Sequence, residues 1–271
     1  LLKQNNINVI YQDARDYHSL SSSFAEINPE IVIHLAAVSH ANKSNKDPYS
    51  TFDHSLRTLE NALDCSRGKV EHFIFNSSSM VYGNFESDEV NEESVCNPIG
   101  IYGALKFSAE KLIIAYNQVF DLPYTIIRPS ALYGRGCISR RVGQVFIENA
   151  LQDKEIVING DGKEKLDFTS IDDLLDGFKS VLSNEKSKNE IFNLTFGRSR
   201  SILEMINILK GEFPKLQVKS EPRDNLMPER GTLSIEKAKR LLGYQPKLEL
   251  ETGYLDYIKW YKKIYAEYKN I

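Results

Sequence analysis

Three short apolar runs, separated by segments with helical periodicity, constrain the fold of this chain more than any other feature. They are EIVIHLAA (residues 30–37), HFIFNSSS (72–79) and YTIIRPS (124–130), and we expect helices between them over residues 48–67 and 102–120. Strands that are apolar on both faces are typical of parallel sheets covered by helices on either side. The alternation therefore predicts the α/β class, with a doubly wound parallel sheet.

Two further signals lie near the start of the chain. The run INVIYQD at residues 7–13 predicts another strand, and the serine-rich segment 19–30 predicts a helix capped by serine. The helix expected over residues 48–67 should end at Gly68, because glycine readily adopts the left-handed conformation that ends helices.

The pattern changes after about residue 135. Helices dominate from there, with short strands expected at 155–160, 191–196 and 216–220, and with helices near 234–242 and 252–268. We expect one domain over residues 1–135 and a smaller, mainly helical lobe over residues 136–271 that closes over the sheet. Interleaving of the two in sequence is an open alternative.

Polar residues gather where the predicted strands end. These clusters are Asp13, HLAAVSH (34–40), NSSSM (76–80) and RPSALYGRG (128–136). The carboxyl ends of parallel strands meet at one edge of a sheet, and ligands bind at that edge in open α/β folds. The sequence therefore predicts a binding site there.

Tyr102 and Lys106 are the strongest candidates for chemistry at this site. Residues four apart project from the same face of a helix, so the two side chains should lie side by side. A nearby ammonium favours the phenolate and should lower the pKa of Tyr102 from its usual value near 10. Such a tyrosine could exchange a proton with a substrate hydroxyl, and Ser78 could bond to the same group. The alternative is a core tyrosine beside a surface lysine.

Composition excludes several function classes. The formal net charge is −3 and the pI is about 6.0, so no basic field indicates nucleic-acid binding. The three cysteines are isolated and the five histidines lack ligand spacing, which predicts neither disulfides nor a metal site. No apolar run reaches the ~18 residues that span a bilayer, and no signal peptide is evident. We expect a cytoplasmic protein without a membrane partner.

The order of these motifs resembles the extended short-chain dehydrogenase/reductase family, and most of all its nucleotide-sugar epimerases and dehydratases. The resemblance covers nearly the whole chain, since VIHLAA, RPSALYG, GDGKEKLDFTSIDDL (160–174) and KAKRLLGYQP (237–246) are similar to family segments. It implies a Rossmann-like, dinucleotide-binding first domain and a substrate-binding second lobe.

The resemblance also implies roles for individual residues. Ser78, Tyr102 and Lys106 match the catalytic triad. The positions that match cofactor contacts are Asp13, Ala14, Leu35, Ala36, Ala37, Ser55, Tyr102, Lys106 and Pro129. Those that match substrate contacts are Ser78, Ser79, Arg141 and Arg230. The expected cofactor is NAD, with NADP as an alternative. His34 is expected to be structural, and His40 is a candidate sugar contact.

Departures from the family pattern refine this expectation. Family members begin with a glycine-rich turn that holds the cofactor phosphates, but the first glycine of this chain is Gly68. We expect that about one βαβ unit, roughly 45–60 residues, is missing from the sequence given. Ala131 and Leu166 replace an asparagine and an arginine that contact substrate in many relatives.

The dehydratases carry an Asp-Glu pair at the positions of Ser79 and Met80, and neither residue here can protonate a leaving hydroxyl. The sequence therefore predicts an NAD-dependent epimerase, similar to UDP-glucose 4-epimerase, that oxidises and re-reduces one sugar carbon. The expected partners are a nucleotide-diphosphate sugar and a second copy of the chain. Two alternatives stay open: a net reductase or dehydrogenase of nucleotide-linked keto sugars, and an inactive cofactor-binding scaffold.

Overall fold

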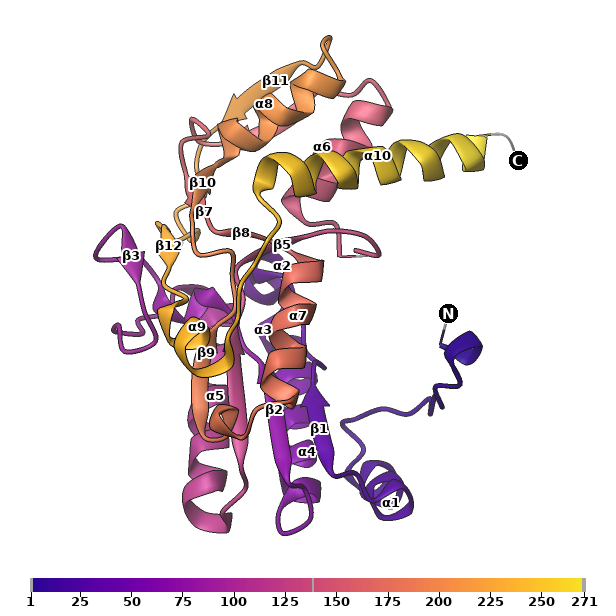
Figure 1. The fold of residues 1–271 in the computed structure, drawn as a ribbon, viewed down its shortest axis with the longest axis vertical. Helices are drawn as coiled ribbons and strands as arrows, with labels where there is room; N and C mark the ends of the chain where they lie inside the picture. Colours follow the sequence, from indigo (N-terminus) through magenta and orange to yellow (C-terminus); the bar gives the residue numbers. More distant parts are fainter. Residues whose placement is uncertain (1, 138, 270–271) are drawn as a thin grey trace.

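A four-stranded parallel sheet forms the centre of the protein (Figure 1). The computed structural model describes residues 2–137 and 139–269, and it pairs the strands in the order β1-β2-β4-β9. Their bounds are β1 Ile31–His34, β2 His72–Asn76, β4 Tyr124–Arg128 and β9 Glu190–Asn193. The three predicted apolar runs are β1, β2 and β4, so the α/β prediction with a parallel sheet is confirmed.

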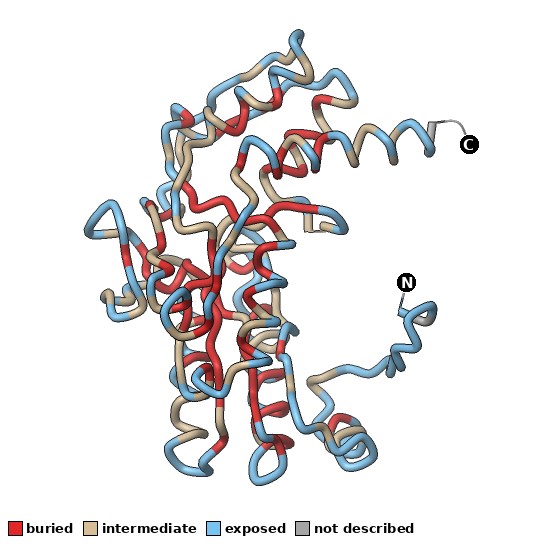
Figure 2. Tube along the Cα trace, viewed as in Figure 1, coloured by how far each residue is buried: buried red, intermediate tan, exposed pale blue. Residues whose placement is uncertain are grey.

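Helices cover both faces of this sheet. On one face a core of aliphatic and aromatic side chains joins the sheet to α1 (Tyr17–Ile27), α4 (Thr58–Ser66) and α5 (Gly100–Phe120). On the other face a second core joins it to α7 (Ile171–Leu182) and α9 (Glu236–Leu242). Figure 2 shows buried residues running through the sheet and the inner sides of these helices.

The strand predicted at residues 7–13 is wrong. Residues 7–13 form no strand, and the segment is extended and exposed, with Tyr11 94% exposed. A lone extended segment gains no ladder hydrogen bonds, and none of the described strands pairs with this one. The N-terminal segment stands away from the sheet in Figures 1 and 2.

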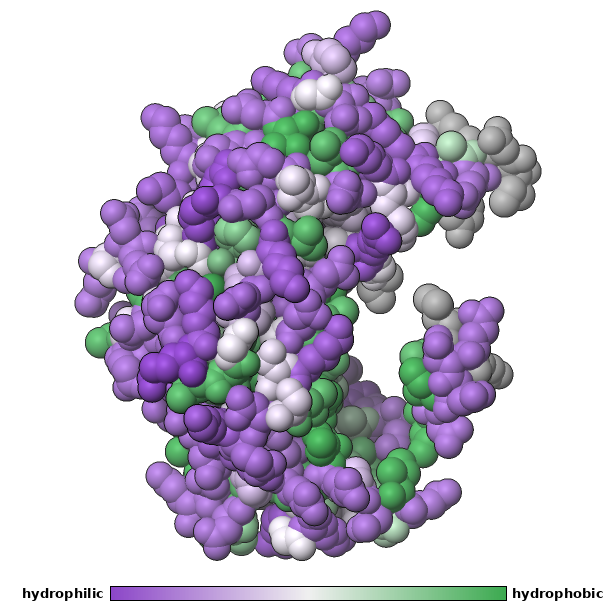
Figure 3. Space-filling view, in the orientation of Figure 1, coloured by the Kyte–Doolittle hydropathy of each residue, from purple (hydrophilic) through white to green (hydrophobic). Residues whose placement is uncertain are grey.

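The first apolar run is parallel but lies at an edge of the described sheet. Ile31 and Ile33 are each 43% exposed, whereas Val32 and His34 face the helices. The expectation of a strand buried on both faces is therefore wrong for β1, because none of the described helices covers the face that carries the two isoleucines. Figure 3 shows hydrophobic side chains along the hollow between the body and the N-terminal segment.

The expected helices are present, but their capping residues and boundaries differ from the prediction. Asp16, not a serine, caps α1 by accepting hydrogen bonds from His18 N and Ser19 N. The helix predicted over residues 48–67 is a run of three elements, namely α3 (Pro48–Phe52), the π-helical turn η2 (Asp53–Arg57) and α4. It ends just before Gly68, which has φ of +67°. Short elements outside these predictions are η1 (Lys3–Asn5), α2 (Ala41–Lys46), η3 (Ser79–Tyr82), β3 (Glu89–Val90) and η4 (Glu185–Ser187).

A second lobe lies over the carboxyl ends of the strands (Figure 1). Its core joins α6 (Val142–Leu151), β6 (Ile156–Asn159), α8 (Ile202–Glu212) and α10 (Leu250–Lys269). Strand β6 pairs in parallel with β11 (Val218–Glu221). The connecting strands are β5 (Ala131–Tyr133), β7 (Lys165–Leu166), β8 (Phe168–Ser170), β10 (Arg200–Ser201) and β12 (Thr232–Leu233). Because β9, α7 and α9 lie with the sheet, the chain crosses between the two parts more than once.

Two buried histidines should make stability depend on pH. Burial lowers the pKa of His34 and of His72 from 6.5 to about 4. His34 packs between Phe73 and Phe75, and His72 bonds to Thr125 Oγ1 at 2.7 Å. The folded state then binds fewer protons than the unfolded state below about pH 6.5, so stability falls as pH falls from there toward 4.

We expect the free energy of unfolding to drop by about 1–3 kcal/mol for each histidine across that window. Urea unfolding at a series of pH values measures the loss. His72→Gln should flatten the curve, and His54→Gln, at an exposed position, should leave it unchanged. A wild-type curve that is flat between pH 6.5 and 4 would contradict the expectation.

Among the described residues, no helix is long and apolar enough to cross a membrane.

Candidate active site

One cavity of about 420 Å³ is lined by six of the thirteen site residues predicted from the sequence, including all four predicted substrate contacts. It lies between the carboxyl ends of β2 and β4 and the second lobe. Ser78, Ser79 and Tyr102 line it at the sheet, and Arg141, Arg223 and Arg230 line it toward the lobe. The expected site at the strand ends is therefore present as a cavity.

A glycine brings Tyr102 close to Ser78. A Cβ atom on Gly103 would lie 2.7 Å from the Met80 carbonyl oxygen, so only glycine lets the first turn of α5 approach η3 this closely. The hydroxyl of Ser78, at the end of β2, then lies beside the hydroxyl of Tyr102 in the same cavity, where it favours the phenolate. The spacing of strand end and helix start thus places the two groups in contact.

The pKa of Tyr102 is raised, the reverse of the expected direction. Burial raises it, and the hydrogen bond with Ser78 and the charge of Arg141 only partly oppose this. Lys106 Nζ donates instead to the Asn76 carbonyl at 2.6 Å and lies 4.6 Å from the centre of the Phe75 ring. In this structure the strand therefore holds the lysine, and the tyrosine, whose pKa is raised, is protonated at neutral pH.

Lys106 is itself strongly affected by its surroundings. Burial lowers its pKa from 10.5 to about 8, and the negative charge of Glu110 opposes that change. A lysine with a pKa near neutral inside a crevice is typical of a functional group, because structural lysines keep the ammonium in water.

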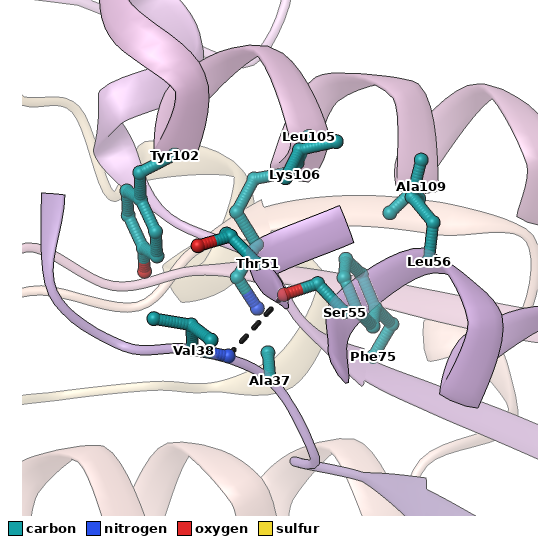
Figure 4. Close-up of a pocket in the computed structure, with 10 residues that line it drawn as sticks. All are labelled: Ala37, Val38, Thr51, Ser55, Leu56, Phe75, Tyr102, Leu105, Lys106 and Ala109. Carbon is teal, nitrogen blue, oxygen red and sulfur yellow. Dashed lines mark hydrogen bonds between the residues drawn. The ribbon is translucent and has the colours of Figure 1, made fainter. Parts of the chain in front are cut away.

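A crevice beside Lys106 is lined by four of the expected cofactor contacts (Figure 4). Ala37, Ser55 and Lys106 line it together with Tyr102, and Ser55 Oγ accepts a hydrogen bond from Val38 N at 3.2 Å. The small side chain of Ala37 leaves the backbone after β1 accessible, and Ala36 and Leu35 next to it are exposed. The crevice has a volume of only about 10 Å³, so it would take one edge of a dinucleotide lying along the accessible backbone after β1.

Asp13 and Ala14 lie farther out along the same side. Asp13 forms an ion pair with Arg15 at 2.6 Å, and Arg15 also reaches Asp53 at 2.9 Å. The Ala14 carbonyl accepts a hydrogen bond from Asn61 Nδ2 at 2.9 Å. These contacts hold the segment against η2 and α4, so an incoming adenine would compete with Arg15 for the Asp13 carboxylate.

The lobe side of the cavity is cationic. Arg230 Nε is buried and has no hydrogen-bond partner among the described residues. Burial, followed by the nearby charge of Arg223, lowers the pKa of Arg230 to about 10. Arg141, at the start of α6, lines the same cavity. A buried guanidinium with a free donor is a ready binding site for a phosphate.

Other predicted residues take positions around this centre. Pro129 lines the main cavity rather than the crevice, and its carbonyl accepts a hydrogen bond from Ser79 N at 2.9 Å. Ala131 and Leu166 also line the cavity, and Leu166 packs into the lobe core. His40 lines it too, with Nε2 bonded to the Ser139 carbonyl.

Sequence reasoning missed three groups here. Arg223 follows β11 and lines the cavity beside Arg230, and no recognised motif marked it. Glu164 lines the cavity with Oε2 buried and without a partner in the described part of the chain. The third group is the buried ion pair of Glu110 and Arg128, joined at 2.7 Å. Glu110 continues the four-residue spacing of Tyr102 and Lys106, a signal that could have revealed it.

Comparison with known proteins places this geometry in a family. The sequence profile described as the NAD dependent epimerase/dehydratase family matches residues 2–195. The chain belongs to this family. The resemblance predicted from the sequence motifs is thereby confirmed.

Relatives within the NAD dependent epimerase/dehydratase family include both activities in its name. A putative UDP-glucose 4-epimerase of Methanocaldococcus jannaschii is 30% identical over 275 residues, covering 96% of this chain and 87% of the relative. A dTDP-D-glucose 4,6-dehydratase of Dictyostelium discoideum is 30% identical over 206 residues, 72% of this chain and 46% of the relative. The crystal structure of UDP-glucuronic acid 4-epimerase from Bacillus cereus, in complex with UDP-glucuronic acid and NAD, matches with a TM-score of 0.88 and 29% identity, covering 96% of this chain and 85% of that one.

Proposed function

We propose that the protein is an NAD-dependent epimerase of nucleotide sugars. The observation that carries the proposal is a single cavity that is lined by Ser78, Tyr102 and four arginines. The arginines suit a diphosphate, which binds guanidinium groups through paired hydrogen bonds. The sugar beyond the diphosphate would then reach the serine and the tyrosine.

In this mechanism Tyr102 exchanges the proton of a sugar hydroxyl. NAD, when bound, supplies the hydride acceptor and returns the hydride to the ketone. Ser78 donates to or accepts from the reacting oxygen, which keeps the hydroxyl aligned with Tyr102. Lys106, Ser55 and the backbone at Ala37 would hold the cofactor at the crevice next to the tyrosine. Re-reduction from the opposite face of the sugar changes its configuration without net oxidation.

Ser79 and Met80 favour epimerisation over dehydration. Both are buried and line the cavity directly after Ser78. Elimination of water needs a group that protonates the leaving hydroxyl, and neither a serine hydroxyl nor a thioether does so at neutral pH. Relatives with the dehydratase name therefore do not decide the activity of this chain.

Mass spectrometry of products tests the proposed activity. The full chain is incubated with NAD and, in turn, with UDP-, dTDP-, GDP- and CDP-sugars, and isomers are separated by chromatography. An isomer of equal mass, formed without net NADH change, is expected. Loss of water would point to a dehydratase, and stoichiometric NADH consumption would point to the reductase alternative. NAD binding without turnover of any sugar would point to the scaffold.

Removal of the cavity arginines should weaken substrate binding more than catalysis. For Arg230→Met we expect KM for the nucleotide sugar to rise about 10- to 100-fold with kcat within about threefold, because a diphosphate contact is present in both ground and transition states. Steady-state kinetics measures the split, and Arg57→Met, at an exposed surface ion pair, is the matched control. A fall in kcat with an unchanged KM would contradict this role.

The proposal extends to a homodimer formed through α5 and the neighbouring helices. On α5 the outward-facing Leu112, Val119 and Phe120 are 38%, 68% and 39% exposed, and Phe52 of α3 is 48% exposed. Burial of such side chains against a second copy would stabilise a dimer. Sedimentation equilibrium at micromolar concentration tests it, since a monomeric mass would contradict the proposal.

A further inference from the structure

A buried carboxylate lies one helical turn beyond Lys106 on α5. Glu110 Oε1 accepts hydrogen bonds from the Ser77 hydroxyl at 2.5 Å and from Arg128 Nε at 3.0 Å, and Oε2 accepts from Arg128 Nη2 at 2.7 Å. The side chains of Arg128 and Glu110 are 3% and 1% exposed. Such a pair adds little net stability, because desolvation offsets most of the attraction. Its position next to the Tyr102–Lys106 pair indicates another role.

The hydrogen bond from Ser77 links Glu110 to the strand end that carries the reacting groups. Asn76, just before Ser77, holds Lys106 through its carbonyl at 2.6 Å. Ser78, just after it, lies beside the hydroxyl of Tyr102 in the same cavity. A single side chain on α5 therefore fixes the middle of a three-residue segment whose two ends contact the two functional residues of the same helix.

Arg128 fixes Glu110 in turn. Two guanidinium nitrogens bond to the carboxylate, a third contact runs from Arg128 Nη1 to the Tyr82 hydroxyl at 3.0 Å, and the guanidinium lies 4.9 Å from the centre of the Tyr82 ring. Burial alone would lower the pKa of Arg128, but the carboxylate of Glu110 raises it well above its usual value. Glu110 is thus held in one orientation.

We propose that Glu110 is a positioning residue for the Tyr102–Lys106 pair: it fixes residues 76–78 against α5 and provides the negative charge that faces Lys106. The inference rests on the proposed function, because it assigns Glu110 a part in that proton transfer. It predicts that the charge of Lys106 and the alignment of Ser78 both change when Glu110 is replaced.

The groups around Lys106 make Glu110 the main source of negative charge there. Tyr102 and Glu110 face it from α5, and His34 interacts with it from β1 while staying neutral because its pKa is about 4. Arg128 of β4 is bonded to Glu110 on the far side. The residues that line the crevice from α3 and η2 are uncharged, namely Thr51, Ser55 and Leu56.

Titration of Lys106 by NMR tests the electrostatic part without any sugar. The carbon-13 shift of Lys106 Cε, assigned by its loss in Lys106→Met, is followed against pH in the full chain. Glu110→Gln should move the Lys106 titration down by about one pH unit, since loss of a neighbouring opposite charge disfavours the ammonium. Ile113→Val, one turn farther along α5 and also buried, should leave it unchanged.

A double variant keeps the test informative if Glu110→Gln alone fails to fold. Glu110→Gln/Arg128→Met replaces the whole ion pair by uncharged groups of similar size, which buried pairs often tolerate. A downward titration shift is again expected, smaller than in Glu110→Gln because the positive charge of Arg128 is lost as well. An unchanged titration in both folded variants would overturn the proposal.

Ser77→Ala tests the positioning part, because it leaves the ion pair in place. We expect kcat for the sugar to fall about tenfold with KM and the Lys106 titration unchanged, since only alignment is lost. An unchanged kcat would overturn this part. If wild-type protein turns over no sugar, the proposed function fails, whereas the Lys106 titration still reports on Glu110.

Discussion

Tyr102→Phe should lower kcat for epimerisation by about 10²- to 10⁴-fold, the range that a positioned proton donor or acceptor contributes. The substitution removes only the hydroxyl, which lies beside Ser78 and lines the cavity. KM should change little, because the arginines of the cavity are untouched. Isomer formation from the best nucleotide sugar, followed by chromatography, gives both constants.

The pH dependence gives a second readout of the same prediction. Burial raises the pKa of Tyr102, so the active phenolate becomes more populated as pH rises, and kcat of the wild type should increase with pH across the neutral range. Residual turnover by Tyr102→Phe should lose this increase. Tyr116→Phe, on the same helix and also half-buried, is the matched control and should behave as wild type. Equal kcat for Tyr102→Phe and wild type would remove Tyr102 from the mechanism.

The parts of the fold that follow from local pattern were predictable. The strands β2 and β4 were predicted because an apolar run reflects a strand that is buried on both faces. The helix α5 was predicted because 3.6-residue periodicity reflects a helix that is buried along one face. Pairing along the sheet edge was not predictable, since a run such as residues 7–13 becomes a strand only where a neighbouring strand supplies hydrogen-bond partners. The exposure of Ile31 and Ile33 was not predictable either, because it depends on which other part of the fold covers β1.

The candidate site also contains residues that the sequence predicted and residues that it did not. Ser78, Tyr102 and Lys106 have a fixed spacing along strand and helix, so the sequence indicated that they meet. The predicted lowering of the Tyr102 pKa was wrong. The effect of Lys106 on that pKa depends on where its ammonium points, and the Asn76 carbonyl holds the ammonium. Arg223 and Glu164 come from loops of the second lobe, whose placement over the sheet is set by tertiary packing alone.

Lys106→Met should raise the stability of the protein and lower its activity at the same time. Burial lowers the pKa of Lys106 from 10.5 to about 8, so the folded state binds fewer protons than the unfolded state between these values. The cost of burying the ammonium is therefore fully present below about pH 8 and vanishes as pH rises above about 10.5. Removing the ammonium should raise the free energy of unfolding by about 1–3 kcal/mol near pH 7. The gain is reduced somewhat because the Asn76 carbonyl loses its hydrogen-bond donor.

Activity should move the other way, with kcat/KM for the sugar lower by about 100-fold or more. The methionine cannot donate to the cofactor or supply a cation beside Tyr102, and both functions act in the transition state. Urea unfolding at about pH 7 and pH 10 measures the stability gain and its loss at high pH. Lys111→Met, at an exposed position of α5, is the matched control and should change neither quantity. A residue that is kept for catalysis at the expense of stability gives a more stable and less active protein when it is replaced. A Lys106→Met protein that is less stable and fully active would therefore mean that the buried ammonium stabilises the fold.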